Sequence, residues 1–380
     1  MGLLLGILIV GIVITGIRST KSEENHTLGD LILSHFEKGI YDRIVKTFMP
    51  VLTYDETEGS REYLGAVLPI YSYMKINEVY DTAKESELTY EMIRAKEAAD
   101  ENHVDEKTGE LVSQNKDQET EKKSQKSVVS FSKEKLSDFD YLRQNFYTVD
   151  RTTTITSDRL NAKKMLEKDM HLAKNVEGPQ VLIYHTHSQE GYADSTPGDL
   201  NTSVVGVGEY LAQLLKEKYE IKVLHHTGTY DVNDRDHAYS NAESAIQKIL
   251  EENPTIEVVI DLHRDGVAEG TRLVTKQDGK QMASIMFFNG LSHTTALGDI
   301  SYLENPYIQD NLAFSFQLQL KAAEHYPGFA RPIYLKGYRY NMHFKPKSLL
   351  VEVGAQTNTL EEAKNSMVPL ADILNKVIME

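Results

Sequence analysis

The ten residues VLIYHTHSQE, at positions 181–190, join a short apolar run to a cluster of histidine and carboxylate side chains. Residues 181–184 have the length and apolar character of a buried strand, and the polar residues begin where that strand would end. Two later segments repeat the arrangement, VVIDLHRD at 258–265 and LLVEVG at 349–354. Buried strands that run directly into polar residues are typical of α/β proteins, whose ligands bind at the carboxyl ends of the strands.

Around these three segments, from residue 179 onward, apolar runs alternate with amphipathic stretches of helical spacing. The pattern predicts strands at 181–184, 221–224, 256–262, 285–288 and 349–353, and helices at 204–219, 242–250, 312–323 and 360–377. Alternation of this kind favours an α/β fold with an open, mostly parallel twisted sheet flanked by helices.

The amino-terminal third has a different composition. Residues 1–17 contain no charge and consist mainly of Leu, Ile, Val and Gly, which predicts a membrane anchor near the lower length limit of a spanning helix. We expect a membrane-proximal region at 18–99, a charged flexible spacer at 100–135, and the main domain at 136–380. Arg18 and Lys21 follow the anchor, and the positive-inside rule alone would place the main domain in the cytoplasm.

Charge and cysteine content exclude several classes of protein. The 380 residues carry a formal net charge of −16, which argues against a protein that binds nucleic acid. There is no Cys, so disulfide frameworks, Cys-ligated zinc, iron–sulfur clusters and thiol catalysis are excluded. Any metal site must therefore be built from histidine and carboxylate ligands.

The three strand ends supply such a ligand set. His187, Glu190 and His263 would converge at one edge of the sheet, with Glu352 close by. Catalytic zinc commonly takes two histidines and one carboxylate and keeps a fourth position for water. Glu352 is then the candidate general base, and burial at its strand end would raise its pKa. The alternative is that these are solvated loop residues or hydrogen-bonded histidines without a metal.

Two further residues are candidates for catalysis. His185 stands two residues before His187 and would lie on the same strand face if the strand continued that far. It could then be a metal ligand, a group that supports a ligand, or a hydrogen-bond donor to the transition state. His225, at the end of the second predicted strand, is the alternative to His185. Arg264 would bind a substrate carboxylate or stabilise an oxyanion.

At residues 181–190, 239–241, 261–265 and 350–354 the sequence resembles the stage II sporulation protein P family, membrane-anchored cell-wall hydrolases of endospore-forming bacteria. The likeness extends over about residues 136–380, and the anchor and spacer agree with it. The resemblance implies a fold like that of zinc amidases and carboxypeptidases. It also implies the activity of a zinc-dependent N-acetylmuramoyl-L-alanine amidase, which cleaves the bond between muramic acid and the stem peptide. Peptide cross-links are a second candidate bond. The same likeness implies His187, Glu190 and His263 as ligands and Glu352 as general base.

The resemblance further implies a biological setting. The substrate would be the peptidoglycan of the septal wall during engulfment, and the partners would be homologues of sporulation proteins D and M. The resemblance thus implies a single-pass protein of the cell membrane whose catalytic domain lies outside the cytoplasm. The positive charges of Arg18 and Lys21 predict the opposite orientation.

One stretch reverses the sign of the acidic chain. Residues 325–351 carry Arg331, Lys336, Arg339, Lys345 and Lys347 with interleaved aromatic residues. We interpret this as a candidate basic surface for an anionic, sugar-bearing polymer, with packed aromatics beside solvated charges as the alternative.

Two competing functions remain from the sequence. The first is a zinc carboxypeptidase-like enzyme that acts on other peptides. The second is a non-catalytic envelope adaptor that binds wall or partner proteins while the histidine and glutamate residues stay idle.

Overall fold

The computed structural model describes residues 131–380. The predicted anchor at 1–17, the membrane-proximal region at 18–99 and most of the predicted spacer lie outside these residues. The first described helix, α6 (Lys133–Ser137), spans the predicted start of the main domain at residue 136. Within 131–380, none of the helices combines the length and the apolar character needed to cross a membrane.

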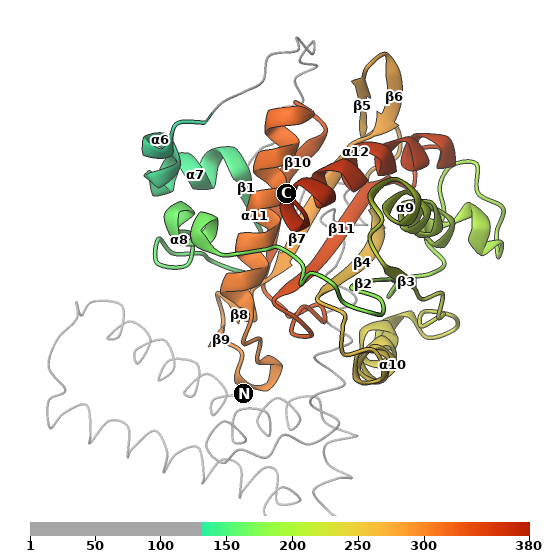
Figure 1. Ribbon diagram of the computed structural model, residues 1–380, viewed down its shortest axis with the longest axis horizontal. Coiled ribbons are helices and arrows are strands. Elements are labelled where there is room, and N and C mark those ends of the chain that lie inside the picture. Colours follow the sequence, from blue (N-terminus) through green and yellow to red (C-terminus); the bar gives the residue numbers. More distant parts are fainter. Residues whose placement is uncertain (1–130) are drawn as a thin grey trace, which may run out of the picture. The chain divides into compact units, whose positions relative to one another are not determined.

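A seven-stranded sheet forms the centre of this part of the chain, with the strand order β1-β10-β7-β11-β4-β2-β3 (Figure 1). Its strands are β1 (Tyr147–Val149), β2 (Val181–Tyr184), β3 (Val223–His225), β4 (Val258–Asp265), β7 (Ile285–Gly290), β10 (Ala330–Lys336) and β11 (Lys347–Ala355). Two small hairpins extend from it, β5 (Val274–Gln277) with β6 (Lys280–Ala283), and β8 (His293–Thr294) with β9 (Gly298–Asp299).

The sheet consists of two parallel groups that run in opposite directions. Strands β11, β4, β2 and β3 are mutually parallel, and so are β1, β10 and β7. The two groups meet at β7 and β11, which pair antiparallel. The predicted α/β fold with a mostly parallel sheet is confirmed. The carboxyl ends of β2, β3, β4 and β11 therefore lie at one edge, and those of β1, β7 and β10 at the other.

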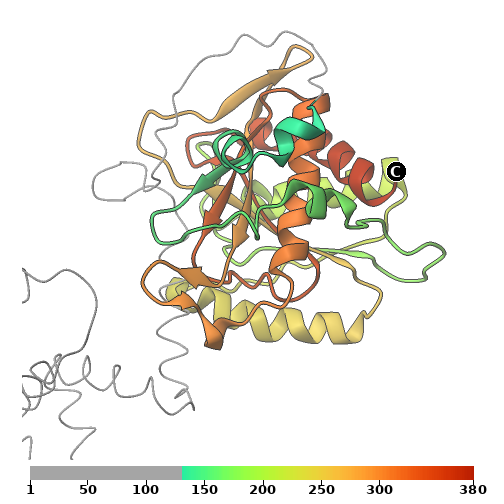
Figure 2. The ribbon, with the colours of Figure 1, turned by 90° about the vertical axis from the view of Figure 1, so that its left-hand side faces the viewer.

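Helices cover both faces of the sheet. The long helices α9 (Val204–Tyr219), α11 (Ile308–His325) and α12 (Leu360–Ile378) pack on one face, and α10 (Ala238–Glu252) lies on the other (Figures 1 and 2). The short helices α7 (Phe139–Phe146) and α8 (Ala162–Glu167) belong to the side of α11. Successive residues of β2 alternate between the faces: Ile183 joins the cluster under α9, whereas Leu182 and Tyr184 join the cluster under α10.

Local signals in the sequence explain where the long helices begin and end. Ser203 caps α9 by accepting a hydrogen bond from the backbone of Val205, and the helix ends at Glu220 in the left-handed conformation. At the start of α12, Thr359 and Glu362 form a reciprocal capping box. Gly208 within α9 lets this helix approach the sheet, because a Cβ there would lie 2.6 Å from the ring of His185.

The expectation of a basic surface over residues 325–351 is wrong. Lys336 is completely buried at the end of β10, and Phe329, Tyr334 and Tyr340 are core residues. Three of the other four cations form ion pairs within the domain, Arg331 with Asp265, Arg339 with Glu243 and Lys347 with Glu257, at 2.7, 2.7 and 3.0 Å. The physical reason is that nearly half of this stretch forms two inner strands of the sheet, so several of its charges pair with carboxylates from other parts of the chain.

Candidate active site

His185 and His187 point to opposite faces of the sheet, because β2 ends at Tyr184 and the alternation of a strand does not continue through both residues. His185 lies on the α9 face. Its Nδ1 lies 2.8 Å from the carbonyl oxygen of Leu262, and its Nε2 lies 3.0 Å from Nε2 of His225. Both ring nitrogens of His185 are thus engaged away from His187. The His185–His225 contact places His225 beside His185 without bringing either ring to Glu190.

His187, His263 and Glu190 lie together on the other side. The rings of His187 and His263 have their centroids 5.5 Å apart, and Nδ1 of His263 lies 3.5 Å from Oε2 of Glu190. Neither histidine has exposed surface, and Glu190 is 2% exposed. The three residues proposed from the sequence as metal ligands are therefore neighbours in a buried site.

A buried carboxylate orients the ring of His263. Asp261 and His263 are two residues apart on β4 and so share a face of the strand. Oδ1 of Asp261 lies 2.7 Å from Nε2 of His263, and the backbone and hydroxyl of Thr186 donate to the same carboxylate at 2.9 and 2.5 Å. Nε2 of His263 therefore faces Asp261, and Nδ1 faces Glu190. A carboxylate beside the second ring nitrogen is usual for a metal-binding histidine.

Glu352 enters the site from the neighbouring strand. On β11 it is the direct register partner of His263 on β4, and its side chain is 3% exposed. Because adjacent strands lie about 4.8 Å apart, in-register side chains on the same face are neighbours. The structure thus brings Glu352 beside His263, where the sequence had placed the candidate general base.

Arg264 holds the loop that carries Glu190. Its backbone N–H donates to Oε2 of Glu190 at 3.0 Å, while its side chain donates to the carbonyl oxygens of Gly191 and Asp265 at 3.1 and 3.2 Å. The guanidinium is therefore bound to main-chain oxygens of the site itself. These contacts use its Nε and Nη1.

Three residues of the site were not found from the sequence. Tyr192 is buried, donates its hydroxyl to the carbonyl of Val353 at 3.3 Å, and has a pKa that burial raises, so it is a neutral phenol. Tyr239, at the start of α10, stacks edge-on against His187 with centroids 5.7 Å apart. Asp261 was recoverable, since its spacing of two from His263 on a strand is a sequence signal. Tyr239 belongs to the 239–241 segment of the resemblance, without a role assigned to it there, and nothing in the sequence marks Tyr192.

The donor set fits zinc in its chemistry. Two ligands at the usual distance from a tetrahedral zinc are separated by about 3.3 Å. The 3.5 Å between Nδ1 of His263 and Oε2 of Glu190 agrees with that spacing. Within residues 131–380, however, no group of three His, Asp or Glu side chains has the spacing needed to hold one metal ion. The fit consequently rests on ligand type, burial and one ligand pair.

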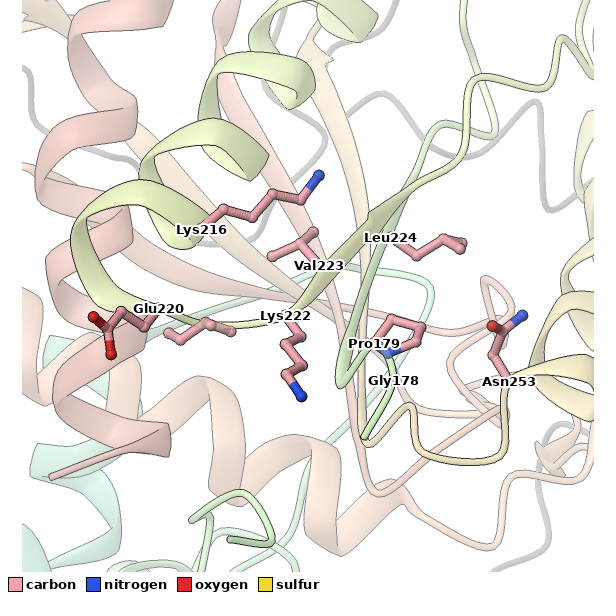
Figure 3. Close-up of a pocket in the computed structure, with 9 residues that line it drawn as sticks. Gly178, Pro179, Lys216, Glu220, Lys222, Val223, Leu224 and Asn253 are labelled. Atoms are coloured by element: carbon pink, nitrogen blue, oxygen red, sulfur yellow. The ribbon is translucent and has the colours of Figure 1, made fainter. Parts of the chain in front are cut away.

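A surface pocket of about 470 Å³ lies elsewhere. It is lined by residues at the amino ends of β2, β3 and β4, among them Pro179, Lys222 and Asn253, as Figure 3 shows. The candidate site lies at the carboxyl ends of the same strands, so this pocket does not belong to it.

Acid should destabilise the fold through His185. Burial lowers the pKa of this residue to about 3, whereas a histidine of the unfolded chain titrates near 6.5. Between these values the unfolded chain binds the extra proton, so stability falls as the pH falls, by about 1.4 kcal/mol per pH unit for one group. The free energy of unfolding should fall between pH 7 and pH 5. We expect this fall to be about 2 kcal/mol smaller in His185→Gln than in the wild type.

Urea unfolding with chelator present, at pH 7, 6 and 5, measures this difference without a contribution from metal release. His171→Gln is the control, because the His171 side chain is 52% exposed. Parallel pH curves for wild type and His185→Gln would show that His185 is not the responsible group.

Solved structures of low similarity align with about half of the chain. The N-acetylmuramoyl-L-alanine amidase AmiC2 of Nostoc punctiforme is 13% identical, with 53% of this chain and 98% of that chain covered, at a TM-score of 0.32. An N-acetylmuramoyl-L-alanine amidase from Clostridium difficile 630 is 12% identical, with 53% and 95% covered, at a TM-score of 0.33.

Sequence relatives are more informative. The stage II sporulation protein P of Bacillus subtilis strain 168 is 22% identical over an alignment of 215 residues, which covers 52% of this chain. The match spans half of the length of that relative, 50%. The family model named stage II sporulation protein P matches residues 58–375, which is most of the chain and includes every candidate site residue. The chain therefore belongs to the stage II sporulation protein P family.

Proposed function

We propose that this chain is a zinc-dependent peptidoglycan hydrolase that cleaves the N-acetylmuramoyl-L-alanine amide bond. The observation that carries the proposal is the gathering of His187, Glu190, His263 and Glu352 in one buried site, in a member of this family. Peptide cross-links are the second candidate bond. Septal wall remodelling during engulfment, with sporulation protein D and M homologues as partners, is the proposed setting.

His187, Glu190 and His263 would hold the zinc. When bound, zinc supplies a Lewis acid for the scissile carbonyl and a water of lowered pKa. Asp261 keeps Nδ1 of His263 available by facing its Nε2, and the Arg264 backbone fixes one oxygen of Glu190. Glu352 would take the proton of the attacking water and deliver it to the leaving amine. Burial of all four side chains strengthens these electrostatic interactions by excluding water.

The same family membership supports a proposal for the location. The chain would be a single-pass protein of the cell membrane, anchored by residues 1–17, with the catalytic domain on the extracytoplasmic side where peptidoglycan lies. Accessibility of the carboxyl-terminal domain to protease in intact and in opened cells tests this arrangement.

Digestion of purified peptidoglycan by the full-length chain tests the activity. We expect soluble stem peptides from the zinc-loaded protein, none after chelation, and recovery when zinc is returned. Equal cleavage of plain peptides that lack muramic acid would favour the carboxypeptidase-like alternative. Binding to the wall without zinc and without hydrolysis would favour the adaptor.

A further inference from the structure

Two of the three candidate ligands stand on the loop that follows β2, residues 185–190. Because β2 lies between β4 and β3 in the sheet, this loop has a neighbour on each side. On the side of β4, Asp261 accepts hydrogen bonds from the backbone and the hydroxyl of Thr186, at 2.9 and 2.5 Å. On the side of β3, the loop is attached to the connection between β3 and α10, residues 226–237.

Asp231 makes the attachment on the side of β3. Its Oδ1 accepts a hydrogen bond from the hydroxyl of Ser188 at 2.8 Å, and its Oδ2 accepts one from the backbone N–H of Gln189 at 3.0 Å. The two donors are the residues that directly follow His187 in the chain. Both oxygens of one carboxylate thus hold the loop next to a candidate ligand.

The same carboxylate lies beside the ring of His187. Oδ2 of Asp231 is 4.0 Å from Nδ1 of His187, which is too long for a hydrogen bond. The side chain of Asp231 is 3% exposed, and that of His187 has no exposed surface. Since little water reaches this contact, the negative charge of Asp231 acts on the imidazole with little screening.

Each candidate histidine ligand is thus accompanied by a buried aspartate. Asp261 lies 2.7 Å from His263 and comes from the same strand, β4. Asp231 lies beside His187 but comes from a separate connection, 44 residues further along the chain. A carboxylate beside the second nitrogen of a metal-binding histidine fixes the orientation of the ring and raises its basicity.

We propose that Asp231 positions His187 for zinc, by fixing the loop that carries this ligand and by placing a negative charge beside its ring. The inference rests on the proposed function for the presence of the metal. A histidine that binds zinc gains positive character, which a nearby carboxylate stabilises. The connection at 226–237 is then part of the metal site, and Arg235 of this connection also contacts the second ligand of the loop, Glu190, at 3.6 Å.

Zinc affinity of the full chain, measured by competition with a chelator of known affinity, tests the proposal without relying on turnover. Asp231→Asn removes the charge, but its amide is able to accept from the backbone of Gln189 and to donate to the hydroxyl of Ser188. Asp231→Ala removes the charge and both hydrogen bonds. We expect zinc binding to be about 10-fold weaker in Asp231→Asn and about 100-fold weaker in Asp231→Ala.

Cobalt in place of zinc separates an effect on the ligands from a loss of stability. The visible absorption of bound Co²⁺ reports the number and the geometry of its ligands. We expect this spectrum to change in Asp231→Ala under conditions where urea unfolding shows the variant to be folded. If either folded variant binds zinc as tightly as the wild type, the role of Asp231 is overturned.

Asp150→Asn is the matched control. Asp150 is completely buried and, like Asp231, accepts hydrogen bonds from a backbone N–H and from a hydroxyl, both of Thr152, at 2.8 and 2.7 Å. It follows β1, at the other edge of the sheet. The zinc affinity and the cobalt spectrum of Asp150→Asn should equal those of the wild type.

Peptidoglycan digestion by the same preparations separates this inference from the proposed function. A wild type that binds zinc without hydrolysis, together with weaker binding in both Asp231 variants, would contradict the amidase and leave the role of Asp231 standing. Hydrolysis by the zinc-loaded wild type, together with unchanged zinc affinity in Asp231→Ala, would support the amidase and contradict the role of Asp231. A wild type that binds no zinc would overturn both.

Discussion

Replacement of Glu352 by Gln should reduce peptidoglycan hydrolysis by about 10²- to 10⁴-fold, while the protein keeps its zinc. Gln has nearly the same shape but cannot accept a proton at neutral pH. The side chain is 3% exposed and sits in register with His263, so a bulkier change would disturb the site for other reasons. Release of stem peptides and zinc content, measured on the same preparation, give the result.

Glu362→Gln serves as the control for that experiment. Glu362 is also buried, at 8% exposure, but it caps α12, a role that Gln can fill. It should retain wild-type activity. Full activity of Glu352→Gln would remove Glu352 from the mechanism.

Asp261→Asn should weaken zinc binding about 10- to 100-fold, with a parallel loss of activity at limiting zinc. The carboxylate lies 2.7 Å from Nε2 of His263 and is held by two donors of Thr186. An amide offers one acceptor in place of two and brings an N–H group toward either His263 or Thr186. The ring of His263 would then lose the orientation that directs Nδ1 toward Glu190. Competition with a chelator of known affinity measures the change.

The chain contains a well-matched control for this variant. Asp150 is completely buried and accepts hydrogen bonds from the backbone and hydroxyl of Thr152 and from the hydroxyl of Tyr334, at 2.8, 2.7 and 2.6 Å. It follows β1, at the opposite edge of the sheet. Asp150→Asn should cost stability with no change in zinc affinity. Equal zinc affinity in wild type and Asp261→Asn would show that Asp261 does not position a ligand.

Local sequence patterns predicted much of the sheet and its helices. The bounds predicted for β2 and α9 agree with the structure at both ends, because an apolar run and a capped amphipathic stretch are local signals. Strand β10 was missed, since Ala330–Lys336 contains a proline and two cations and resembles an exposed basic segment. Lys336 is buried, and Arg331 pairs with Asp265, 66 residues away in the sequence, and no local pattern records either fact.

One feature of the sheet and one feature of the site likewise depend on the three-dimensional arrangement. The antiparallel pairing of β7 with β11 reverses part of the sheet, and hydrophobic periodicity carries no information about strand direction. The separation of His185 from His187 depends on where β2 stops, a boundary that sequence patterns locate only within a few residues. By contrast, the meeting of Glu190, His263 and Glu352 followed from strand ends, because carboxyl ends of parallel strands share an edge.

Arg235 shows a further limit. It lies in Asn233-Asp234-Arg235-Asp236-His237, which as a sequence is typical of a polar turn. Its Nη2 lies 3.6 Å from Oε1 of Glu190. This contact depends on the attachment of Asp231 to Ser188 and Gln189 of the ligand-bearing loop, 43 and 42 residues earlier in the chain.

The identity of the bond cut in peptidoglycan is the most direct test of the central claim. Purified sacculi are treated with the zinc-loaded full-length chain and with the chelated chain, and the products are analysed by mass spectrometry. The account predicts glycan strands with free N-acetylmuramic acid and released stem peptides that begin with L-alanine, formed only when zinc is present. Products of any other bond alone, or the same products from the chelated chain, would contradict it.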